Sequence, residues 1–294
     1  MKKYNRLNSM LRVDFRRMFT SSMLHILCGA ALVMPILILV MTSMVAGSTV
    51  TDPQTGAVTT MEAFTSTWQI IGASGGMMAM DMTANDAPAL LPVGQAPAAP
   101  PESYGFQGGL VTPAAGSGVT ALCNINLIFF MAGVYVCLFI AEDFRSGYAK
   151  NLFAVRSKKR DYVVSKTLAG FTAGALMLVC FFIGAVLGGA FAGLPFTLGA
   201  GGVFGLIMCM LAKIFLMGVF VAIAVAVSCL AKSRSWLSIM LFAFAGMLLF
   251  MMIPMMTPLD AGVIHVGLCL AGSAMFGFGL GAISNMLLSR QDLV

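Results

Sequence analysis

The sequence predicts an all-α integral membrane protein with six transmembrane helices, and its composition and its apolar segments lead to that prediction. Hydrophobic residues make up 59% of the chain, charged residues only 10%, and the mean hydropathy is +0.94. A soluble domain carries about a quarter charged residues, so lipid is the expected solvent. The 294 residues also contain six apolar segments long enough for helical spans of about 20 residues, which leaves little room for a soluble catalytic domain.

The apolar segments alternate with clusters of basic residues in a way that predicts the topology. Lys and Arg are retained on the cytoplasmic side of a membrane. Sixteen of the 17 basic residues agree with one orientation, which places both termini in the cytoplasm. We therefore expect a multi-pass protein of a bacterial-type cytoplasmic membrane, with a tail at 1–22 and a six-span domain at 23–294. The predicted spans are 23–46, 119–141, 167–192, 205–230, 236–256 and 263–288.

The segment before the first span has the pattern of an amphipathic helix. Within residues 5–19, apolar side chains recur at helical spacing, and Arg12, Arg16 and Arg17 fall largely outside that stripe. A basic helix of this kind lies in the headgroup plane of a membrane. The alternative is a solvated basic tail that only sets topology, and the spacing favours the interfacial helix. The apolar positions are Leu7, Met10, Leu11, Phe15, Met18 and Phe19.

A long segment, residues 47–118, separates the first two spans and is predicted to face outward. Its Pro and Gly content argues against one continuous helix. Residues 61–71 could form a short helix on the outer leaflet with Trp68 as an interfacial anchor, and the alternative is a partly disordered loop. The spans carry pairs of glycines four residues apart, which let helices pack closely in lipid. These pairs are Gly170 and Gly174, Gly184 and Gly188, and Gly277 and Gly281.

No motif in the chain predicts an enzyme, a metal site or a bound cofactor. The chain lacks a phosphate-binding G-x-x-x-x-G-K-[ST] loop, and its seven cysteines have no metal-ligand spacing. Its basic residues adjoin the spans, so nucleic acid is not an expected partner. Residues 72–75 match the G-x-S-G pattern of rhomboid-like intramembrane serine proteases, with Ser74 as nucleophile and His265 as the base. Because Ser74 lies in the polar outer segment, the protease is a less favoured alternative.

Lys213 is the one residue with an ionised side chain that falls inside a predicted span. A charged side chain at the centre of a membrane helix costs about 2.5–3.5 kcal/mol on insertion scales, and such residues tend to be functional. Two interpretations stay open. The long side chain could snorkel to the outer interface, or it could line a central pathway.

The connection between the second and third predicted spans, residues 142–166, reads EDFRSGYAKNLFAVRSKKRDYVVSK. It resembles the first cytoplasmic loop of type-2 ATP-binding-cassette permeases, in which an acidic residue, R-S-G and Lys-Asn-Leu precede an S-R-x-x-Y-x-x-S-K-like segment. Two positions depart from that pattern: Asp143 replaces Glu beside Glu142, and Tyr148 stands where Thr is common. The matching residues are Asp143, Arg145, Ser146, Gly147, Lys150, Asn151 and Leu152, followed by Arg160, Tyr162, Ser165 and Lys166.

This resemblance implies the permease subunit of an ATP-driven exporter for a hydrophobic or amphipathic substrate such as a drug, peptide or lipid. In the family the loop forms a coupling helix that docks on a separate ATPase subunit, so ATP and Mg would bind that partner. A second permease protomer would complete the translocation path as a homo- or heterodimer. The main alternative is a secondary transporter that uses Lys213. The resemblance assigns ATPase coupling to Asp143, Arg145, Gly147, Lys150, Asn151, Arg160 and Tyr162.

Overall fold

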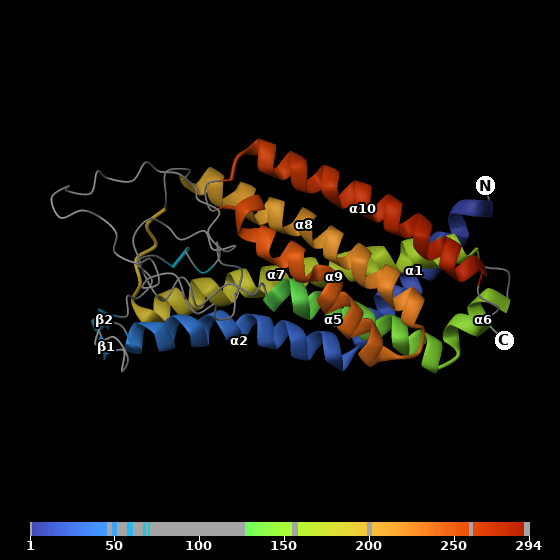
Figure 1. The fold of residues 1–294 in the computed structure, drawn as a ribbon, viewed down its shortest axis with the longest axis horizontal. Coiled ribbons are helices and arrows are strands. Elements are labelled where there is room, and N and C mark those ends of the chain that lie inside the picture. The colour runs from blue at the N-terminus through green and yellow to red at the C-terminus, as the bar shows by residue number, and fades with distance from the viewer. Residues whose placement is uncertain are drawn as a thin grey trace, which may run out of the picture.

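Long α-helices lie side by side along one axis in the computed structural model, and a short antiparallel hairpin sits at one end (Figure 1). The structure describes residues 2–45, 49–51, 58–60, 67, 68, 70, 127–154, 158–198, 202–258 and 261–290. The helices are α1 (Lys2–Thr20), α2 (Ser22–Val45), α5 (Leu127–Arg145), α6 (Tyr148–Ala154), α7 (Lys159–Ala192), α8 (Gly202–Ala231), α9 (Ser235–Met256) and α10 (Val263–Arg290). The hairpin pairs β1 (Thr49–Thr51) with β2 (Val58–Thr60), with Thr49 opposite Thr60.

Five of these helices are long and apolar enough to cross a membrane: α2, α5, α7, α8 and α10. The expected class, an α-helical multi-pass membrane protein, is thereby confirmed. Helix α7 begins at Lys159 rather than near 167, so residues 159–166 belong to the helix and not to the preceding connection. Several of these residues are buried against neighbouring helices, which explains why the helix starts early despite its basic sequence.

The connections between helices sort into two ends of the bundle. Helix α1, helix α6, the turn between α8 and α9, and the last turns of α10 lie at one end, which we call the α6 end (Figure 1). The β1–β2 hairpin and the connections from α7 to α8 and from α9 to α10 lie at the opposite end, the hairpin end. Successive long helices from α2 onward therefore run in opposite directions, as expected when successive spans cross a membrane.

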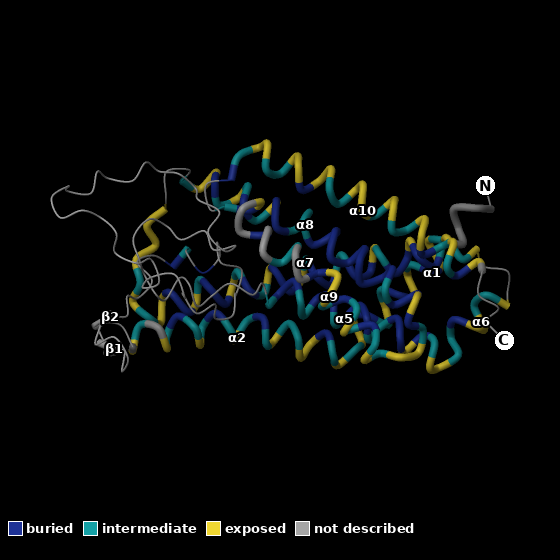
Figure 2. The backbone as a smooth tube through the Cα atoms, in the orientation of Figure 1, coloured by how far each residue is buried: buried dark blue, intermediate teal, exposed yellow. Residues whose placement is uncertain are grey.

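Helix α8 forms the core of the bundle. It packs against α5, α7, α9 and α10, and most of its middle residues are buried (Figure 2). Aromatic rings from three helices meet there, with Phe220 of α8 stacked on Phe250 of α9 at 4.9 Å between centroids. Helix α10 lies along α8 but exposes most of its other faces, with Ile264 and Phe278 among its most exposed side chains (Figure 2). Exposed apolar side chains of this kind suit a lipid-facing surface.

Glycine pairs allow two of the closest helix contacts. A Cβ placed on Gly184 of α7 would lie 2.1 Å from the carbonyl oxygen of Leu32, and one on Gly188 would lie 2.8 Å from Cα of Ile36, both in α2. The predicted close packing at this pair is therefore confirmed, as it is at Gly170 and Gly174, which face side chains of α5 and α8. A Cβ on Gly277 or Gly281 of α10, by contrast, would meet nothing within 4 Å among the described residues.

We expect Gly184→Ala to destabilise the protein, because its new Cβ would collide with the α2 backbone and not with a flexible side chain. Overpacking of this kind costs about 1–3 kcal/mol. The matched control is Gly277→Ala, which adds the same methyl group to an apolar helix in open space. The thermal unfolding midpoint in detergent should fall for the first variant and stay unchanged for the second. Equal midpoints would contradict the close approach of α2 and α7.

Trp68 packs against the hairpin-end terminus of α7. Its ring stacks on Phe182 at 6.1 Å and meets Phe196 edge-on at 5.6 Å, and its Nε1 donates to the Phe196 carbonyl oxygen at 3.1 Å. The anchor predicted at Trp68 thus has a specific protein contact. The remainder of the helix predicted at 61–71 and Ser74 of the protease alternative lie outside the described residues.

Candidate functional site

Helix α1 buries one face and exposes the other, which confirms the amphipathic helix predicted at 5–19. Met10, Asp14 and Met18 succeed one another at four-residue intervals and are all buried against the bundle, mainly against α7. Residues four apart share one face of a helix, so a carboxylate lies in the middle of the apolar stripe. Asp14 is fully buried, and a buried carboxylate requires a cation or hydrogen-bond donors beside it.

Four charged side chains from three helices satisfy that requirement. Lys166 Nζ of α7 lies 2.7 Å from Asp14 Oδ1 of α1 and 2.6 Å from Asp143 Oδ2 of α5. Arg17 Nη1 of α1 lies 2.7 Å from the other Asp143 oxygen, Oδ1. We call Asp14, Arg17, Asp143 and Lys166 the four-charge network. Its two carboxylates and two cations balance in formal charge.

Two neutral side chains of α7 complete the hydrogen bonding of the carboxylates. The Tyr162 hydroxyl donates to Asp143 Oδ2 at 3.1 Å, and the Ser165 hydroxyl donates to Asp14 Oδ2 at 2.6 Å. Both donors are fully buried. Each carboxylate therefore has a cation and a hydroxyl group as partners, which offsets part of the cost of removing it from water.

A glycine turn connects α6 to this network. Helix α5 ends at Arg145, and Gly147 has a φ of +74°, a conformation that L side chains rarely adopt. The amide of Asn151 then donates to the Gly147 carbonyl oxygen at 3.1 Å as α6 begins. The turn lets the chain change direction within two residues, so a helix of seven residues follows α5 directly.

Aromatic rings cover the cations of the network. Lys166 Nζ lies 4.1 Å from the Phe139 ring centroid, and the Arg17 guanidinium carbon lies 4.3 Å from that of Tyr148, the first residue of α6. These distances are in the range of cation–π attraction. Burial opposes the charge of Arg17, but Asp143 beside it raises the pKa of Arg17 above its ordinary value. Burial, with the nearby Asp14 and Asp143 carboxylates, likewise raises the pKa of Tyr148, so its hydroxyl stays neutral.

The network joins four separate segments into one unit. The side chains of Asp14, Asp143 and Lys166 have no exposed surface. Removing one partner from a buried ion pair leaves an uncompensated charge and costs about 3–5 kcal/mol. Helices α1, α5 and α7 are therefore held together by contacts that are expensive to break, and α6 joins them through the ring of Tyr148.

The structure divides the residues predicted for ATPase coupling into two groups. Asp143 and Tyr162 are buried in or beside the four-charge network, and Gly147 forms the turn. The other members carry polar or charged groups at the surface of the α6 end; they are Arg145, Lys150, Asn151 and Arg160. The ion pairs of Asp143 thus lie inside the bundle, while the side chains of the second group reach its surface.

Three residues of the network were not predicted as site residues: Asp14, Arg17 and Lys166. The sequence contains a signal for the first, since Asp14 is the sole acidic residue before the first span and interrupts the apolar stripe between Met10 and Met18. A charge on the apolar face of a helix is a candidate for a buried ion pair. No sequence signal identifies Lys166 as its partner, because they are 152 residues apart.

Lys213 lies inside the bundle near the hairpin end. It is 2% exposed, and its Nζ donates to Thr257 Oγ1 at 3.0 Å. Thr257 follows the last residue of α9, so the ammonium group lies at the partly negative C-terminal end of that helix. This position differs from a side chain that snorkels to the surface. A role in a transport pathway stays a prediction.

Comparison of the chain with protein-family models, with curated proteins and with solved structures finds no match.

Proposed function

We propose that this chain is the permease subunit of an ATP-driven exporter and that α6 docks on a separate ATPase subunit. The observation that carries the proposal is the position of α6. It is a two-turn helix with Lys150 and Asn151 exposed, and it is attached through Gly147 and Tyr148 to the four-charge network. A connection that only sets topology needs neither a helix nor a buried attachment. The resemblance of residues 142–166 to the coupling loop of type-2 ATP-binding-cassette permeases supports the same function.

The proposed topology has six spans, formed by α2, α5, α7, α8, α9 and α10. Helix α9 has 22 residues, or about 33 Å at 1.5 Å per residue, which matches a hydrocarbon core of about 30 Å. The α6 end carries the basic residues of α1, α6 and the adjoining helix ends, so it would face the cytoplasm. Exposed Arg16 and Phe19 on the outer face of α1 suit a helix in the headgroup layer.

The four-charge network would transmit movement from the ATPase to the spans. A displacement of α6 reaches Arg17 through Tyr148 and reaches α5 directly through the turn at Gly147. Because Lys166 of α7 binds carboxylates of both α1 and α5, helices α1, α5, α6 and α7 would move as one unit. Helices α5 and α7 pack on α8, so the displacement would arrive at the core of the bundle.

A second protomer would be needed to form the translocation path. Two cavities among the described residues have volumes of about 260 and 50 Å³, and pockets for drug-sized molecules have about 300–1,000 Å³. Buried side chains fill the core around α8, and neither cavity provides the space for such a molecule. A path between two copies of the chain, or between this chain and a related one, would provide it for a hydrophobic or amphipathic substrate.

Co-purification tests this function. A tagged chain extracted from its native membrane in mild detergent should bring down a polypeptide with a G-x-x-x-x-G-K-[ST] loop, and the eluate should hydrolyse ATP. The alternative, a secondary transporter, is favoured by one observation, the burial of Lys213 in a candidate span. Transport that needs an ion gradient, no ATPase and an intact Lys213 would replace our proposal with that alternative.

A further inference from the structure

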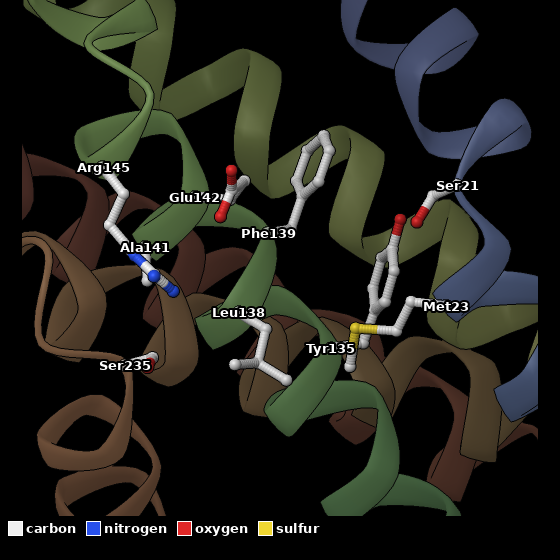
Figure 3. A pocket seen from close by; sticks show the side chains of 9 residues that line it. All are labelled: Ser21, Met23, Tyr135, Leu138, Phe139, Ala141, Glu142, Arg145 and Ser235. Atoms are coloured by element: carbon white, nitrogen blue, oxygen red, sulfur yellow. The ribbon is translucent and has the colours of Figure 1, made fainter.

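We infer that a pocket along α5 binds the headgroup of a zwitterionic phospholipid that carries a primary ammonium group. The pocket has a volume of about 260 Å³ and follows three turns of α5, from Tyr135 to Arg145 (Figure 3). Its other walls come from the junction between α1 and α2, at Ser21 and Met23, and from Ser235 at the start of α9. This inference does not depend on the proposed function.

The polarity of the pocket changes along its length. Arg145, Glu142 and Ser235 line it toward the α6 end, and Leu138, Met23 and the ring of Tyr135 line it farther from that end. A pocket that is charged at one end and apolar at the other suits an amphiphile in a single orientation. The charged end also lies on the same side of the bundle as the amphipathic helix α1 (Figure 1), where headgroups are expected.

Both charges of the pocket are available to a ligand. Glu142 and Arg145 are exposed, and neither side chain takes part in the ion pairs of the four-charge network. Figure 3 shows the Arg145 side chain extending toward Ser235, while the Glu142 carboxylate lies nearer to Phe139. A ligand with one anionic and one cationic group, a few bonds apart, could meet both.

A buried hydroxyl group also lies in the wall of the pocket. Tyr135 is 1% exposed, and its hydroxyl oxygen makes no hydrogen bond among the described residues. The hydroxyl points toward Ser21 at the edge of the pocket (Figure 3).

The size of the pocket fits a headgroup better than a drug-sized molecule. Its volume of about 260 Å³ lies below the range of about 300–1,000 Å³ that is typical of pockets for drug-sized molecules. Beyond the pocket, the helices that border it expose apolar side chains, among them Ile26 of α2 and Trp236 and Met240 of α9. These surfaces would contact acyl chains, which a soluble zwitterion would not possess.

The charges predict which headgroups are preferred. The Arg145 guanidinium would bind the phosphate with charge-assisted hydrogen bonds, and the Glu142 carboxylate would accept hydrogen bonds from a primary ammonium. A choline headgroup has no N–H donor for that carboxylate. A glycerol headgroup has no positive charge, so its phosphate would be repelled by Glu142. Phosphatidylethanolamine should therefore be enriched over phosphatidylcholine and phosphatidylglycerol.

Fluorescence quenching by brominated lipids measures this preference directly. The variant Trp68→Phe leaves Trp236, next to Ser235 of the pocket, as the one tryptophan. The full chain is reconstituted in phosphatidylcholine vesicles in which a tenth of the lipid is brominated phosphatidylethanolamine, phosphatidylglycerol or phosphatidylcholine. We expect phosphatidylethanolamine to be enriched about two- to fivefold at Trp236, since partly exposed ion pairs are weak.

Glu142→Gln should remove this enrichment, because the amide no longer attracts the ammonium group. The matched control is Asp161→Asn, which removes another carboxylate at the α6 end that does not line the pocket, and it should keep the enrichment. Thermal unfolding of each variant in detergent checks that it is folded. Quenching in proportion to mole fraction, equal enrichment of phosphatidylglycerol, or enrichment that survives Glu142→Gln would each overturn the inference.

Discussion

Lys166→Met is expected to lower the free energy of unfolding by about 3–5 kcal/mol, because it removes the cation shared by two buried carboxylates. Asp14 would lose its ion pair, and Asp143 would keep Arg17 as its one cationic partner. Methionine has a similar length and no charge, so the loss reports electrostatics rather than a cavity. The measurement is equilibrium unfolding in detergent micelles, followed by circular dichroism.

Two further variants make this result specific. Lys150→Met removes an exposed cation from the same end of the protein and should change stability by less than about 0.5 kcal/mol. The double variant Asp14→Asn with Lys166→Met leaves the Arg17–Asp143 pair neutral and should recover most of the lost stability. A Lys166→Met protein as stable as Lys150→Met, or a double variant no better than the single one, would show that the network does not hold α1 to α5 and α7.

Gly147→Val is expected to abolish export while the protein still inserts in the membrane. Gly147 has a φ of +74°, and a β-branched residue held in this region is strained by about 1–3 kcal/mol. The chain would relieve that strain by changing the turn between α5 and α6. Tyr148 would then leave Arg17, and the exposed face of α6 would no longer be presented in its present direction. The measurement is substrate-stimulated ATP hydrolysis in proteoliposomes.

Gly193→Val is the matched control for this variant. Gly193 has a φ of +67° at the end of α7, and an added Cβ would meet nothing within 4 Å at either glycine. The backbone strain is therefore the same, but Gly193 lies at the hairpin end. Both variants should lose similar stability, and Gly147→Val alone should lose coupling. Equal transport by the two would mean that α6 has no role beyond connecting two spans.

The sequence predicts the helices well because composition and periodicity are local properties. The first span was placed at 23–46 and the helix α2 covers Ser22–Val45, while the amphipathic helix at 5–19 corresponds to α1, Lys2–Thr20. The start of α7 was placed too late, since basic residues were assigned to a connection. They continue the helix because Tyr162, Ser165 and Lys166 are buried by contacts with α1 and α5, which local pattern does not reveal.

The candidate site was only partly predictable for the same reason. Asp143, Gly147 and Tyr162 could be selected from a short contiguous motif, and the structure places all three at or beside the network. The network also depends on Asp14, whose hydrogen-bond partners in α7 are more than 150 residues away. Periodicity can mark Asp14 as unusual, but only the packing of α1 on α7 shows which cation it meets.

Lys213 shows a further limit of sequence reasoning. The sequence left snorkelling and a pathway-lining position as alternatives, both based on depth in the span. The structure places its Nζ beside Thr257 at the end of α9, and Cys209 Sγ donates a hydrogen bond to the carbonyl oxygen of the same residue at 3.5 Å. Lys213 of α8 thus places its ammonium group at the C-terminal end of α9. This contact depends on how α8 and α9 pack, which the sequence of either helix does not reveal. The pathway-lining position stays a prediction.

Site-specific photo-crosslinking from α6 tests the central claim most directly. A photoreactive phenylalanine analogue at the exposed position of Lys150, activated in native membranes, should link the chain to an ATPase subunit identified by its phosphate-binding loop. The same group at Leu198, which is exposed at the hairpin end, should give no such product. Crosslinking of an ATPase from Leu198, or from neither position while transport is active, would contradict the docking of an ATPase on α6.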